Sequence, residues 1–183
     1  MDLAKNSINI SKIIKSVIFA LVGSALLAIS SKIQTPFTLV PATMQTFVVM
    51  FLGIVLGYKL ATLSVILYLI EGSLGLPVFA KGGGVGYLLG PTGGYLIGFI
   101  FTAFFAGHID NKKDPILIFL YLLFSVSIIY ILGLGGLWNY MGLEKNFYEV
   151  FLIGAKPFLL IEIYKILILT VLSRQLFKFR KFI

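Results

Sequence analysis

The sequence predicts an all-α integral membrane protein, a bundle of six transmembrane helices whose long outer loops cover a ligand pocket. Of its 183 residues, 59% are hydrophobic and 12% charged, and the mean hydropathy is +1.04. Such a chain has more apolar surface than water tolerates, so it belongs in a bilayer. Because the composition does not shift along the chain, residues 1–183 are expected to form one membrane-embedded domain.

Six apolar segments follow one another between glycines, prolines and charged residues. They cover residues 13–31, 42–57, 59–75, 91–108, 115–134 and 157–177. The first segment resembles a signal peptide, but since more spans follow it, we interpret it as an uncleaved first helix. Only "GYK" separates the second segment from the third, which predicts a tight helical hairpin. Several segments are shorter than the ~20 residues that cross hydrocarbon alone, so neighbouring segments or loops must cover part of the depth.

The distribution of cations predicts the orientation. With six spans both termini share a side, and placing them in the cytoplasm assigns ten cations to that side and four to the outside. The ten are Lys5, Lys12, Lys15, Lys59, Lys112, Lys113, Arg174, Lys178, Arg180 and Lys181; the four are Lys32, Lys81, Lys145 and Lys156. The positive-inside rule favours this multi-pass arrangement in the cell membrane. The longer connections 32–41, 76–90 and 135–156 then lie outside.

Two stripes of small residues recur every four positions, which lets helices approach closely. The first span carries Ala20, Ser24 and Ala28, and this stripe suits either packing within the bundle or contact with another protein. The fourth span carries Gly94, Gly98, Thr102 and Ala106, for which internal packing is the better interpretation.

Several kinds of chemistry find no support in the sequence. The glycine-rich stretch 76–99 fits neither the P-loop nor the dinucleotide fingerprint, so the chain has no recognisable nucleotide site. Without cysteine it has no thiolate catalysis or thiolate metal site. The only histidine, His108, suits a helix end better than a metal site and lies far from the other polar residues. We therefore expect no enzyme, no metal and no cofactor.

The strongest polar signal is "GAKPFLLIEIYK" near the end of the chain. Pro157 suits the first turn of a helix, and Glu162 and Lys165 follow on one face, three residues apart, whereas Tyr164 points elsewhere. Charges embedded in a membrane need a partner, water or a ligand. The pair is either a structural ion pair or the polar floor of a ligand pocket, in which Glu162 accepts ligand N–H groups and Lys165 donates to a ligand oxygen.

A second polar signal is "IQTPFTLVPATMQTF", residues 33 to 47. Pro36 and Pro41 interrupt the helix, and Thr43 and Gln45 put hydrogen-bonding groups at the entry to the next span. Thr43 also suits a helix cap. Glu71 is ambiguous, because it can reach the interface or pair with Lys81 on the following loop.

Three stretches in this order, "PFTLVPATMQTF", "GSLGLPVFAKGGGVGYLLGPTGGYLIGF" and "GAKPFLLIEIYK", resemble the BioY family. These are the biotin-specific substrate-binding (S) components of energy-coupling-factor (ECF) vitamin transporters. The resemblance implies a six-helix protein that binds biotin from outside and is energised by a transmembrane coupling protein and a pair of cytoplasmic ATPases. An S component for thiamine or riboflavin, or a structural membrane subunit without ligand, are the alternatives.

The resemblance also implies roles for particular residues. The family's acidic residue, typically Asp, stands here as Glu162, three before Lys165, and both are implied to bind biotin. The stripe on the first helix is implied to contact the coupling protein, although Ser24 stands where alanine is more usual. We expect the loop 76–90 to fold over the pocket. Lys81 and Tyr87 in this loop, and Tyr95 in the span after it, are candidates for contact with the ligand. Each of these side chains also suits a purely structural role.

Overall fold

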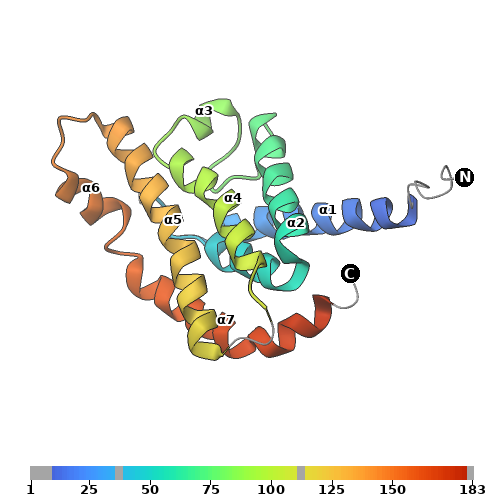
Figure 1. Cartoon of the computed structure of the whole chain (residues 1–183). Helices are drawn as coiled ribbons and strands as arrows, with labels where there is room; N and C mark the ends of the chain where they lie inside the picture. Colours follow the sequence, from blue (N-terminus) through green and yellow to red (C-terminus); the bar gives the residue numbers. More distant parts are fainter. Residues whose placement is uncertain (1–9, 36–38, 111–113, 181–183) are drawn as a thin grey trace, which may run out of the picture.

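The computed structural model describes residues 10–35, 39–110 and 114–180. The helices in these ranges are α1 (Ile10–Lys32), α2 (Gln45–Ser73), α3 (Val85–Leu88), α4 (Gly93–Gly107), α5 (Pro115–Met141), α6 (Phe147–Gly154) and α7 (Leu159–Phe179). In Figure 1, α3 lies at the top and α6 at the upper left, whereas the end of α4 and the start of α5 lie toward the bottom. The loop after α2 and helix α6 therefore lie toward the end of the bundle opposite the end of α4 and the start of α5 (Figure 1).

The helix α2 is two helices joined at a sharp bend. Gly57 has φ 77° and ψ 169°, values outside the helical region that favour glycine, so the predicted break at this residue is confirmed. The bend is held by Arg180, whose guanidinium donates to the backbone oxygens of Gly53 (2.7 Å) and Gly107 (2.9 Å). One arginine therefore ties the end of α7 to the first half of α2 and to the last turn of α4.

The stripe on α4 packs inside the bundle against α5, as predicted. A Cβ atom on Gly94 would lie 2.2 Å from the backbone oxygen of Leu132, and one on Gly98 would lie 2.7 Å from Cα of Ile129. The Thr102 hydroxyl donates to a backbone oxygen of α5 at 2.7 Å. Backbones at this separation leave no room for side chains, which explains the small residues.

The prediction of a long loop at 135–156 is wrong. Helix α5 continues through Met141, and α6 forms after Asn146, whose side chain accepts the Tyr148 N–H. Gly136, which falls in that predicted loop, permits contact instead, because a Cβ atom on it would lie 3.1 Å from Cα of Gly94 on α4. Close approach, rather than a break in the helix, requires glycine there.

The stripe on α1 also packs within the bundle. Ala20 and Ser24 are 2% and 1% exposed, Ala28 is half-buried, and the Ser24 hydroxyl donates to the Glu71 carboxylate on α2. Glu71, for which the interface or a pairing with Lys81 were the alternatives, thus also bonds to α1. In this conformation α2 contacts the stripe. The exposed face of α1 carries larger residues such as Ile29.

Replacing Ala20 with leucine should therefore destabilise the chain itself. Overpacking a close contact typically costs about 1–3 kcal/mol, so thermal unfolding of Ala20→Leu in detergent should occur at a lower temperature than in the wild type. Ala25→Leu is the matched control, because Ala25 is exposed on the same helix. Equal unfolding temperatures for the two variants would contradict this packing.

The outer surface of the bundle suits hydrocarbon. Within the described ranges, three helices are long and apolar enough to cross a membrane, namely Lys12–Lys32, Gln45–Ser73 and Pro115–Met141; Gly93–Gly107 is apolar but shorter. Large apolar side chains face outward, among them Ile131 at 68% and Val171 at 79% exposure. A surface of this kind is stable in lipid and not in water.

Candidate ligand-binding site

A pocket lies between the segment before α2, the beginning of α2, the loop after α2, and helices α4, α5 and α7. The space between its lining atoms, with the open mouth included, is about 550 Å³. It is lined by Val40, Pro41, Ala42, Thr43, Gln45, Thr46, Ala80, Tyr87, Thr92, Tyr95, Leu96, Phe99, Ile129, Tyr130, Phe158 and Glu162. An apolar cluster that includes Met50, Ile54 and Ile166 packs α2 against α7.

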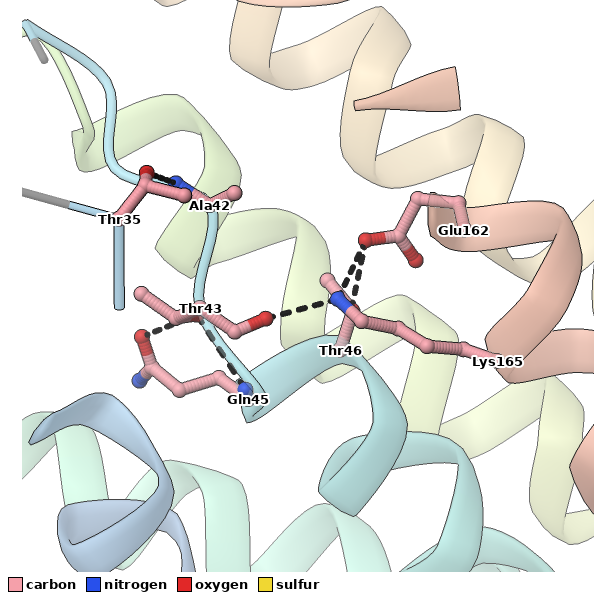
Figure 2. Close-up of polar contacts among 7 residues, drawn as sticks. All are labelled: Thr35, Ala42, Thr43, Gln45, Thr46, Glu162 and Lys165. Carbon is pink, nitrogen blue, oxygen red and sulfur yellow. Dashed lines mark hydrogen bonds and ion pairs between the residues drawn. The ribbon is translucent and has the colours of Figure 1, made fainter. Parts of the chain in front are cut away.

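Glu162 and Lys165 form a buried ion pair beside this pocket, with Lys165 Nζ 2.8 Å from Glu162 Oε1. The same Nζ donates to the Thr43 backbone oxygen at 2.7 Å and to Thr46 Oγ1 at 2.8 Å. An ammonium group has three hydrogens, so each has an acceptor on the protein. Figure 2 shows the ammonium group lying among these three acceptors. Lys165 itself does not line the pocket.

The two carboxylate oxygens of Glu162 have different surroundings. Oε1 accepts from Lys165 and from the Thr46 hydroxyl at 2.9 Å. Oε2 is buried and has no hydrogen-bond partner among the described residues, and in Figure 2 no contact is drawn to it. A buried acceptor without a partner is costly. Because Glu162 lines the pocket, Oε2 is an acceptor suited to a ligand N–H group.

The chain reaches this arrangement through a short hairpin between α1 and α2. Thr35 N donates to the Ala42 backbone oxygen (2.9 Å), and Met44 N donates to that of Ile33 (3.0 Å). This hairpin delivers residues 40–43 to the pocket. The Thr43 hydroxyl accepts the Gln45 N–H at 3.2 Å. Thr43 thus supports the helix start, as one interpretation predicted, while its carbonyl holds Lys165.

Aromatic rings form much of the wall. Tyr95 is buried, donates its hydroxyl to the Gly154 backbone oxygen (2.9 Å), and meets the Tyr130 ring edge to face at 6.2 Å. Tyr87 stacks on Phe79 at 5.1 Å. Tyr95 therefore presents its ring to the pocket while its polar end is bonded to protein.

Other predicted residues lie away from the pocket. Lys81 is exposed and does not line it, because the preceding Phe79 and Ala80 turn inward and Gly82, with φ 138°, turns the chain after it. Tyr164 is 59% exposed, so the prediction that it points away from the pair is confirmed. His108 lies at the end of α4, with Nδ1 2.8 Å from the Phe104 backbone oxygen.

Several lining residues were missed in the sequence. Thr46 is the most important, because it bonds to both members of the ion pair. It lies three residues after Thr43, and this closeness in the sequence is the one signal that associates it with the polar residues already named. Tyr130 and Phe158 lie inside apolar runs and carry no comparable signal.

An aromatic pocket with a buried ion pair at its side, inside a bundle with a lipid-compatible surface, defines a membrane-embedded protein that binds a small molecule. The model of the BioY family matches residues 4–182, and this chain belongs to that family.

Named relatives agree with this membership. The probable biotin transporter BioY of Pyrococcus horikoshii is 36% identical over 153 residues, 83% of this chain and 90% of that protein. The biotin transporter BioY of Thermotoga maritima is 37% identical over 172 residues, 91% and 96% of the two chains. The crystal structure of the S-component for biotin from an ECF-type ABC transporter has a TM-score of 0.77 and 26% identity, covering 92% of this chain and 93% of that one.

Proposed function

We propose that this chain is the biotin-binding S component of an energy-coupling-factor transporter. The observation that carries the proposal is the buried Glu162–Lys165 pair beside an aromatic pocket, in which Glu162 Oε2 has no hydrogen-bond partner among residues 10–35, 39–110 and 114–180. The named relatives and the solved S component support the same ligand.

Biotin matches the chemistry of this pocket. Its two ureido N–H groups need acceptors, and Glu162 offers one. Its bicycle and its aliphatic tail need apolar or aromatic walls, which Tyr87 and Tyr95 contribute. Thr43 and Gln45, at the start of α2, add hydrogen-bonding groups to the pocket lining. Lys165 bonds to a ligand oxygen only if it releases one of its three present acceptors, so its first role is to hold Glu162 in place.

The topology and partners complete the proposal. The two halves of α2 count as two spans, and α1, α4, α5 and α7 make the total six. Both termini lie in the cytoplasm, and the loop 76–90 lies over the pocket. A coupling protein and a pair of ATPases supply the energy. Contact of that coupling protein with Ala20, Ser24 and Ala28 requires α1 to expose a face that now packs on α2.

Equilibrium titration of the purified chain with biotin, thiamine and riboflavin tests the proposal. We expect saturable binding of biotin and none of the other two. Tight binding of thiamine or riboflavin would favour another vitamin, and binding of none of the three would favour a structural subunit. The ligand pocket and the buried, partnerless Glu162 Oε2 argue against the last outcome.

A further inference from the structure

The loop after α2 is held by its own backbone oxygens. We call residues 76–84 the strap. Four side chains donate to three consecutive strap carbonyls: Ser31 to Val78 (2.8 Å), Tyr68 to Val78 (3.1 Å), Lys32 to Phe79 (2.6 Å) and Gln34 to Ala80 (2.9 Å). Three of these donors come from α1 and the residues after it, and one comes from α2. The strap is therefore tied to both helices.

The strap is also held by one buried ring. Phe79 is fully buried and meets the Tyr68 ring at 5.4 Å, edge to face. A Cβ atom on Gly72 would lie 2.0 Å from this ring, so only glycine leaves space for it. Ala80, the next residue, lines the pocket. The contacts that hold Phe79 and its neighbours in place therefore also hold one wall of the ligand site in place.

Tyr68 connects this strap to a pocket residue. It is fully buried and does not line the pocket. Its oxygen lies 3.1 Å from the Val78 backbone oxygen and 2.7 Å from Gln45 Nε2. A carbonyl only accepts, so the single phenolic hydrogen goes to Val78, and the phenolic oxygen is left to accept from Gln45.

This donor order fixes how Gln45 is oriented. The NH₂ group must face Tyr68, and the Oε1 atom then faces the Thr43 hydroxyl, which donates to it at 3.1 Å. Gln45 is 3% exposed and lines the pocket. With phenylalanine at position 68, the amide would lose the acceptor that fixes this orientation, and its N–H would be buried without a partner.

We propose that Tyr68 is a positioning residue for the ligand site. It holds the Gln45 amide in one orientation at the pocket wall and joins that amide to the strap through Val78. The inference rests on the proposed binding of biotin and extends it to a residue that lies outside the pocket.

A double-mutant cycle on the full chain tests the role, with biotin affinity as the readout. Tyr68→Phe should weaken biotin binding about tenfold, and Gln45→Met should weaken it at least as much. If Tyr68 acts through Gln45, adding Tyr68→Phe to Gln45→Met should cost much less than tenfold. Unchanged affinity in Gln45→Met, or a full tenfold loss from Tyr68→Phe in both backgrounds, would overturn the role.

A control variant separates this role from a general loss of structure. Lys32→Met removes another donor to the strap, at Phe79, without touching Tyr68 or Gln45, so its biotin affinity should stay within about twofold of the wild type. A loss equal to that of Tyr68→Phe would overturn the link to Gln45. Failure of the wild-type chain to bind biotin would overturn the proposed function instead. Should Tyr68→Phe fail to fold, Gln45→Met still measures the amide directly.

Discussion

Glu162→Gln is expected to lower the affinity for biotin by about ten- to more than a hundredfold. A hydrogen bond to a charged group contributes roughly 1.5–3 kcal/mol, and each 1.4 kcal/mol is a factor of ten in affinity. In this chain the affected acceptor is Oε2, which is buried and has no hydrogen-bond partner in the described part of the chain. Equilibrium titration of the purified variant with biotin measures the loss.

Glu149→Gln is the matched control for this measurement. It makes the same chemical change at an exposed position in the first turn of α6, away from the pocket. Its affinity should equal that of the wild type. If Glu162→Gln also bound biotin as tightly as the wild type, the carboxylate would not be a ligand group and the site assignment would be wrong.

Lys165→Met is expected to lower the free energy of unfolding by about 3–5 kcal/mol, because removing one partner of a buried ion pair leaves the other charge uncompensated. Both side chains are less than a tenth exposed, and Lys165 also supports Thr43 and Thr46. Thermal unfolding in detergent measures the change. Lys156→Met, at an exposed position, should leave the unfolding temperature unchanged.

The double variant Glu162→Gln/Lys165→Met separates stability from binding. Replacing both charges removes the uncompensated one, so the double variant should unfold at a higher temperature than Lys165→Met alone. Its biotin affinity should remain as low as that of Glu162→Gln. Recovery of affinity together with stability would show that the pair serves the fold and not the ligand.

How far the site can be predicted depends on how local each contact is. Glu162 and Lys165 are three residues apart on one helix, so their pairing follows from helical geometry. The contact of Thr46 with Glu162 joins residues 116 positions apart. Such a contact depends on how α2 packs on α7, which helical periodicity within one segment does not specify.

The glycines show the same limit for the fold. Gly57 breaks α2 as predicted, because "GYK" is the only polar interruption between two apolar runs. Gly136 falls in the segment predicted as a loop, yet it lies inside α5. A glycine that permits a bend and a glycine that permits close packing have the same local signature, and only the neighbouring helix distinguishes them. In the structure that neighbour is α4, which meets Gly136 at Gly94.

The ion pair also bears on how the chain enters the membrane. Each charged side chain costs on the order of 2.5–3.5 kcal/mol at the centre of an inserting helix. In α7 this cost is offset by Thr43 and Thr46, which lie at the beginning of α2. Helix α7, which is synthesised after α2, thus finds its compensating groups on a much earlier part of the chain. We therefore expect α7 to be poorly inserted on its own and to integrate stably only once α2 is already in the bilayer.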